Sequence, residues 1–180
     1  AYGISARTAA LPVRMAREMG LRVGLLKLVT VWPFAENSVK ELAAEVTGYA
    51  RSEDTRKVAR EIGLCDRVCD SAAEAVDGAD LVVLCVPVGA MSAVAAEIGP
   101  HLEPGATVSD VGSVKRAVID AVGPHMPGGV HFIPGHPVAG TEHSGPRSGF
   151  AELFENRWTL LTPVDGTDEA ALRRLAGFRF

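Results

Sequence analysis

Apolar runs that favour strands alternate with stretches of helical periodicity along most of the chain. The clearest strand covers residues 80–86, where Leu-Val-Val-Leu-Cys-Val follows Asp80 without a polar interruption. Such a run is typical of a strand buried on both faces, as in a parallel sheet. The pattern predicts further strands at 22–32, 46–49, 107–109 and 130–134, and helices at 9–19, 38–45, 55–63, 90–98, 114–123 and 169–177.

This alternation also predicts the fold class. Strands separated by helices of this length are joined by right-handed crossovers, which place the strands parallel and the helices over the sheet. We therefore predict an α/β, Rossmann-like fold with a mostly parallel sheet and helices on both faces.

Composition narrows the function classes. The chain has 180 residues, of which 47% are hydrophobic and 22% charged, which is ordinary for one globular domain. Its net charge of -4 provides no basic footprint for nucleic acid, and no apolar run reaches the roughly 18 residues of a membrane span. We expect a soluble, cytoplasmic protein that binds neither nucleic acid nor membranes. The spacing of Cys65, Cys69 and Cys85 fits neither a redox pair nor a zinc site, so we predict buried or idle thiols and no metal.

Two glycine-bounded loops carry the candidate chemistry. The first, Asp110-Val-Gly-Ser-Val-Lys115, follows the strand predicted at 107–109. The second, Pro134-Gly-His-Pro-Val-Ala-Gly-Thr-Glu-His-Ser-Gly145, follows the strand predicted at 130–134. Ligands of open α/β sheets bind beyond the carboxyl ends of strands, so we expect the chemistry around Ser113 and His136.

These loops belong to a longer set of matching segments. The set includes Gly48-Tyr-Ala-Arg-Ser52, Ala79-Asp-Leu-Val-Val83, Val86-Pro87 and Leu153-Phe-Glu-Asn-Arg-Trp158. In this order, from about residue 46 to 178, the chain resembles the nucleotide-binding domain of prephenate dehydrogenases, including the arogenate and cyclohexadienyl variants. The resemblance implies oxidative decarboxylation of prephenate or arogenate with NAD(P), in tyrosine biosynthesis, by a parent enzyme that is a homodimer.

The resemblance also implies roles for residues of the two loops. His136 would accept the substrate's hydroxyl proton as hydride leaves, a task that suits an imidazole. Ser113 would hold the hydroxyl or the His, with capping of the following helix as the competing interpretation. Lys115 could contact a substrate or cofactor charge, but an ordinary helix-surface Lys is the default interpretation. The mouth of the site would be lined by Thr141, Glu142, Ser144 and Gly145.

The cofactor preference depends on the end of the second family strand. An acidic side chain there binds the ribose hydroxyls of NAD, whereas Arg accommodates the 2′-phosphate of NADP. The chain has Ala50-Arg51-Ser52, with no carboxylate before Glu53, which favours NADP over NAD. The alternative is that Arg51 is only a solvated loop residue. Further cofactor contacts are expected from Ser52, Val86, Pro87, Val88 and Gly112, although Pro87 could simply end a strand.

The first 45 residues differ from the family, which opens with a strand, a G-x-G-x-x-G turn and a helix. Instead, Arg17-Glu-Met-Gly-Leu-Arg-Val-Gly-Leu-Leu26 and Val31-Trp-Pro-Phe34 are similar to the α subunit of 2-oxoacid:ferredoxin oxidoreductases. We predict that residues 1–45 are a foreign βαβα-like segment that replaces the first Rossmann unit. Residues 46–180 would be the dinucleotide-binding domain, truncated before the family's C-terminal helical dimerisation domain.

The missing glycine turn normally brings backbone N–H groups to the pyrophosphate, so cofactor binding is the decisive test. Because the resemblance implies that a second domain completes the cleft, we expect this fragment by itself to be weakly active or inactive. Two alternatives stay open: a noncatalytic fusion fragment, and another NADP-linked Rossmann dehydrogenase.

Overall fold

The computed structural model describes residues 23–24, 45–140, 146–147 and 157–177. Its strands are β1 (Val23–Gly24), β2 (Val46–Gly48), β3 (Arg67–Val68), β4 (Leu81–Leu84), β5 (Thr107–Asp110), β6 (His131–Phe132), β7 (Gly135–Pro137) and β8 (Thr159–Leu161). Its helices are α3 (Glu53–Glu61), α4 (Ala72–Val76), α5 (Val88–Ile98), α6 (Lys115–Val122) and α7 (Glu169–Gly177), with 3-10 turns η1 (Gly99–His101) and η2 (Gly123–His125).

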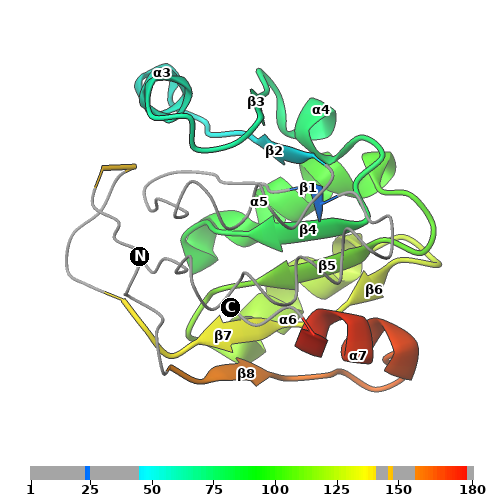
Figure 1. Cartoon of the computed structure of the whole chain (residues 1–180). Coiled ribbons are helices and arrows are strands. Elements are labelled where there is room, and N and C mark those ends of the chain that lie inside the picture. The colour runs from blue at the N-terminus through cyan, green and yellow to red at the C-terminus, as the bar shows by residue number, and fades with distance from the viewer. Residues whose placement is uncertain (1–22, 25–44, 141–145, 148–156, 178–180) are drawn as a thin grey trace.

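Six strands form one parallel sheet in the order β3-β2-β1-β4-β5-β6 (Figure 1). This confirms the predicted α/β, Rossmann-like fold. Val23 and Gly24 lie at the centre of the sheet, between β2 and β4, and confirm the strand predicted at 22–32 for these two residues. The helices predicted at 9–19 and 38–45 fall outside the described residues, apart from residue 45. The boundary between a foreign segment and the domain stays a prediction.

Side chains of β4 alternate between two cores, one on each face of the sheet. Val82 and Leu84 pack in the cluster that contains Met91 of α5, with Val118 of α6. Leu81 and Val83 pack in the cluster on the opposite face, with Ala171 and Leu175 of α7. Figure 1 shows α5 and α6 behind the sheet and α7 in front of it. Because both faces are covered, every residue of β4 is apolar and buried, as the sequence predicted.

Some elements differ from the prediction. Helix α3 begins two residues earlier than expected, because Ser52 is its N-cap. Helix α4 was not predicted, since five residues are too few to show helical periodicity; its start is marked by Ser71, whose Oγ accepts a hydrogen bond from the Glu74 N–H at 3.1 Å. Strands β3, β7 and β8 were also missed, and β7 pairs antiparallel with β8 in a second, two-stranded sheet.

Helix α7 supplies a first testable prediction. The Asp168 carboxylate accepts the N–H of Ala171 at 2.7 Å, and this bond lowers the pKa of Asp168. A carboxyl whose pKa is lower in the folded state stabilises the protein above its unfolded pKa and loses that effect as pH falls. We expect Asp168→Ala to lower Tm at neutral pH, with the difference shrinking in acid, in thermal unfolding followed by circular dichroism. Glu169→Gln, which removes an exposed ion pair with Arg173, is the control. If both variants lower Tm equally, the bond from Ala171 to Asp168 does not stabilise the start of α7.

Two further findings bear on the sequence predictions. Within the ranges that the structure describes, no helix is long and apolar enough to cross a bilayer. Cys65 and Cys69 are buried, as predicted, and Cys85 is half-buried.

Candidate functional site

The loops after β2, β4 and β5 carry most of the residues predicted to bind a cofactor. Because these strands are parallel, their carboxyl ends meet at one edge of the sheet, where open α/β sheets bind ligands. The edge receives Arg51 after β2, Pro87 after β4 and Ser113 after β5, and all three residues are exposed. The fold therefore brings three predicted site residues to the same edge.

Asp110 joins this edge to the second sheet. The residue ends β5 and is fully buried. Its Oδ2 accepts the N–H of Gly112 at 2.7 Å, and its Oδ1 accepts the N–H of Gly135 at 3.1 Å. The Lys115 ammonium donates both to the Asp110 carboxylate and to the Gly135 carbonyl. Asp110 and Lys115 therefore hold Gly135 by its N–H and its C=O, one residue before His136.

Burial disfavours the charged forms of Asp110 and Lys115. It raises the pKa of the Asp110 carboxyl, and the bonds from Lys115 and from the backbone N–H groups of Gly112 and Gly135 oppose that rise. Burial likewise lowers the pKa of the Lys115 ammonium, against the attraction of Asp110. The buried Asp110 carboxylate without its cation would be costly. Lys115 thus lies in a partly buried ion pair with Asp110, and the prediction that it is an ordinary helix-surface Lys is wrong.

His136 lies at the middle of β7, on a strand where the sequence suggested a loop. It is half-buried and stands opposite Leu160 of β8. The strand is fixed at both ends: the Thr162 N–H donates to the Pro134 carbonyl and the Val138 N–H to the Trp158 carbonyl, each at 2.8 Å. The imidazole is therefore carried by a backbone that is held on both sides.

Three neighbours of His136 on its face of the second sheet are apolar. Side chains two apart on a strand share a face, and opposed residues of an antiparallel pair do too. His136 and Val138 of one chain segment thus share a face with Leu160 and Trp158 of the other. Trp158 is 79% exposed and Leu160 53%. This strip can contact an apolar ring beside an imidazole. Sequence reasoning used Trp158 only as part of a family match.

Gly135 is required by close approach of the chain, which gives a second prediction. A Cβ there would lie 2.9 Å from the Asp110 carbonyl oxygen and 3.0 Å from Ser109 Oγ. A backbone atom cannot move aside cheaply, so Gly135→Ala should destabilise the protein by about 1–3 kcal/mol in urea unfolding. Gly89→Ala on α5 is the control, because its Cβ would meet nothing within 4 Å. If Gly135→Ala loses no more stability than Gly89→Ala, the close contact between Gly135 and Asp110 is not maintained in solution.

The remaining predicted residues near β4 and β5 have different surroundings. Ser113 does not cap α6, whose N-cap is Val114 without a side-chain bond, so the capping alternative is wrong. Gly112 is crowded, since a Cβ would lie 3.0 Å from Asp110 Oδ2. Val86 packs in the core, whereas Pro87 is exposed and Val88 half-buried at the start of α5. Four predicted lining residues lie outside the described residues: Thr141, Glu142, Ser144 and Gly145.

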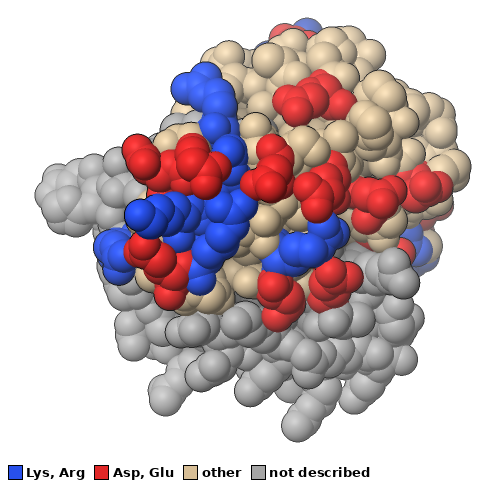
Figure 2. Space-filling view, turned by 90° about the horizontal axis from the view of Figure 1, so that it is seen from above, with Lys and Arg blue, Asp and Glu red and all other residues tan. Residues whose placement is uncertain are grey.

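The arginine in the loop after β2 differs from the two arginines of α3 in its ion pairs. Figure 2, seen from above, shows Lys and Arg side chains interleaved with Asp and Glu. Arg56 and Arg60 both pair with Glu53 and Asp70. Arg51 forms no ion pair within the part of the chain that the structure describes. The residue is exposed.

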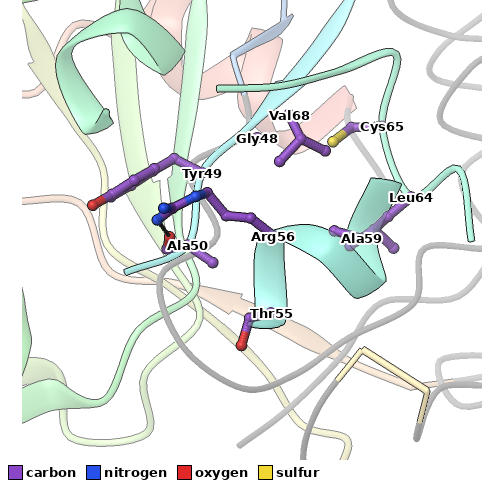
Figure 3. A pocket seen from close by; sticks show the side chains of 9 residues that line it. All are labelled: Gly48, Tyr49, Ala50, Thr55, Arg56, Ala59, Leu64, Cys65 and Val68. Carbon is purple, nitrogen blue, oxygen red and sulfur yellow. Dashed lines mark hydrogen bonds between the residues drawn. The ribbon is translucent and has the colours of Figure 1, made fainter. Parts of the chain in front are cut away.

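Ser52 and a small pocket complete this corner of the edge. The Ser52 hydroxyl accepts the Thr55 N–H at a long 3.5 Å, so it caps α3 only weakly. The pocket beneath α3 is mostly apolar, and Arg56 is its charged lining residue (Figure 3). Its lining residues are Gly48, Tyr49, Ala50, Thr55, Arg56, Ala59, Leu64, Cys65 and Val68.

A family model described as the nucleotide-binding domain of prephenate dehydrogenase matches residues 37–178. The chain belongs to this family. Among the relatives of this prephenate dehydrogenase domain, the cyclohexadienyl dehydrogenase of Zymomonas mobilis is 39% identical over 158 residues, which are 87% of this chain and 54% of that protein. The chain thus spans about half the length of this curated relative.

Solved structures agree with the family. A prephenate dehydrogenase from Aquifex aeolicus, in complex with hydroxyphenyl propionate and NAD+, matches with a TM-score of 0.69 and 25% identity, covering 87% of this chain and 55% of that one. A second kind of relative is also present: the 2-oxoglutarate synthase subunit KorA of Methanothermobacter thermautotrophicus is 51% identical over 47 residues, 26% of this chain and 12% of that protein. This similarity is consistent with the resemblance noted for the first 45 residues of this prephenate dehydrogenase domain.

Proposed function

We propose that the chain is the dinucleotide-binding part of an enzyme that oxidises prephenate or arogenate with loss of carbon dioxide, in tyrosine biosynthesis. The proposal depends on one observation: Asp110 and Lys115 bond to each other and to the N–H and C=O groups of Gly135. These bonds anchor the segment before His136 to the end of β5, so an imidazole stands beside the edge where the family binds its dinucleotide.

In this proposal the nicotinamide, when bound, accepts hydride from the carbinol carbon. His136 accepts the proton of the hydroxyl on that carbon, since loss of hydride makes the hydroxyl strongly acidic. Ser113, exposed after β5, orients the hydroxyl or the imidazole. Carbon dioxide leaves as the ring becomes aromatic, and this step needs alignment more than further chemistry from the protein.

The residues present fit NADP better than NAD. Arg51 is exposed at the carboxyl edge without an acidic partner among the described residues, and the stretch Ala50-Arg51-Ser52 has no carboxylate before Glu53 to bind a ribose hydroxyl. A guanidinium binds phosphate with paired N–H donors. Ser52, Pro87 and Val88 would flank the cofactor, whereas the space beside Gly112 is filled by Asp110, Met91 and Val118.

The test is calorimetric titration of the purified chain with NADP and then NAD, followed by an assay of prephenate and arogenate oxidation through the absorbance of the reduced nicotinamide. Binding of either dinucleotide at micromolar concentration, with oxidation of one substrate, supports the proposal. A chain that binds neither dinucleotide would instead be a noncatalytic fusion, an outcome that the similarity to KorA favours. We place the protein in the cytoplasm and its parent enzyme in a homodimer; gel filtration of the parent tests the latter.

A further inference from the structure

Arg56 reaches back from α3 to the loop that carries Arg51. Its Nη1 donates to the carbonyl oxygens of Ala50, at 2.6 Å, and of Arg51, at 3.1 Å. Figure 3 shows the side chain extending from the start of α3 past Tyr49 towards Ala50. The side chain is only 14% exposed, so water competes weakly for these bonds.

Other groups hold the guanidinium where it is. Its centre lies 5.5 Å from the centroid of the Tyr49 ring, within cation–π range. Its Nη2 donates to the Glu53 carboxylate, and its Nε lies 3.8 Å from the Asp70 carboxylate. The Nη1 and Nη2 donors of Arg56 are therefore directed at protein groups, whereas Nε makes no hydrogen bond within the described residues. Arg51, in contrast, is exposed.

The two carbonyls belong to the two peptide groups that flank the Arg51 Cα. The Ala50 carbonyl lies in the peptide before that Cα, and the Arg51 carbonyl in the peptide after it. Fixing both peptide planes fixes the direction of the Cα–Cβ bond between them, because a peptide group is planar. Arg56 thus sets the direction in which the Arg51 side chain leaves the backbone.

We propose that Arg56 is a positioning residue that aims Arg51 at the 2′-phosphate of NADP and so sets the preference for NADP over NAD. The inference rests on the proposed function, in which Arg51 binds that phosphate. Arg56 itself makes no contact with the cofactor. Its effect should therefore appear with NADP, vanish when Arg51 is absent, and spare NAD, which has no 2′-phosphate.

The experiment is a double-mutant cycle of Arg51→Met and Arg56→Met on the full chain, with NADP and NAD titrated calorimetrically. Arg51→Met should weaken NADP binding about tenfold, and Arg56→Met about three- to tenfold, with NAD affinity changed less than about twofold. In the Arg51→Met background, Arg56→Met should cause no further loss. Arg60→Met is the matched control, since Arg60 also pairs with Glu53 and Asp70 but, among the described residues, bonds no loop carbonyl. Arg56→Lys keeps the charge near Tyr49, and its NADP-to-NAD ratio should lie between those of the parent and Arg56→Met.

The outcomes separate this inference from the proposed function. If the parent chain binds neither dinucleotide, or Arg51→Met leaves NADP affinity unchanged, the cofactor assignment fails and the role of Arg56 fails with it. If Arg51→Met acts as expected but neither Arg56 variant alters the ratio of NADP to NAD affinity, only the positioning role is overturned. Equal losses from Arg56→Met in both backgrounds, or losses shared by NAD or by Arg60→Met, overturn it as well.

Discussion

Lys115→Met should destabilise the protein by about 3–5 kcal/mol, because it leaves the fully buried Asp110 carboxylate without its cation. Domains of this size have a total stability of about 5–15 kcal/mol, so the variant should lose a large share of it. Urea unfolding followed by circular dichroism measures the loss. Within the described residues, the carboxylate would keep its bonds from the N–H groups of Gly112 and Gly135.

The dependence of this loss on pH identifies its cause. Burial already raises the pKa of Asp110, and removal of the ammonium should raise it further. An acid whose pKa is higher in the folded state costs stability where it is ionised, and protonation relieves that cost. The deficit of Lys115→Met should therefore narrow as pH falls from neutral towards mildly acidic, which a loss of packing alone would not do.

Two further variants complete this test. Asp110→Asn combined with Lys115→Met removes both charges, so the double variant should lose less than the sum of the single losses. Arg116→Gln, one residue further along α6, breaks an exposed pair with Asp120 and should cost less than about 0.5 kcal/mol. The idea would be wrong if the losses of unfolding free energy of the two single variants add up in the double variant and the loss of Lys115→Met does not change with pH. Asp110 and Lys115 would then not stabilise each other.

The pattern of apolar residues was sufficient to predict the parallel sheet, and the reason is visible in β4. A strand buried on both faces must be apolar throughout, and its neighbours must be joined by helices that cover it. The pattern could not predict β7 and β8, because Pro134, Gly135 and Pro137 have the composition of a loop. These strands depend on contacts between segments far apart in the chain, such as the bond between Gly135 and Asp110.

The sequence led to His136 and Ser113 but not to Asp110, although Asp110 was part of the same motif. A carboxylate at the end of a strand is most often solvated. A possible signal was the Lys five residues later, but the sequence does not show that the two side chains turn inward and meet at Gly135. Positioning residues of this kind act through the backbone, and a motif read as a set of ligands does not identify them.

His136→Asn should lower kcat for prephenate or arogenate oxidation about 10²–10⁴-fold, the usual range for loss of a general base. Asn has the size and some of the hydrogen-bonding capacity of His but cannot accept the proton at neutral pH. The NADP affinity should change less than kcat, because His136 lies on β7 of the second sheet, whereas Arg51 follows β2 of the main sheet. Steady-state assays give kcat, and calorimetric titration gives the affinity.

His131→Asn is the control, since His131 is also half-buried but lies on β6 in the main sheet; its kcat should match that of the parent. If kcat of His136→Asn lies within about threefold of the value for the unmutated protein, His136 is not the proton acceptor.

Lys115→Arg separates the base from the residues that hold it. The variant keeps a cation beside Asp110 but alters the bond to the Gly135 carbonyl, so it should lower kcat by less than His136→Asn does. Steady-state assays of the two variants give both values of kcat. A smaller loss for Lys115→Arg is the expected difference between a group that positions the imidazole and the group that takes the proton.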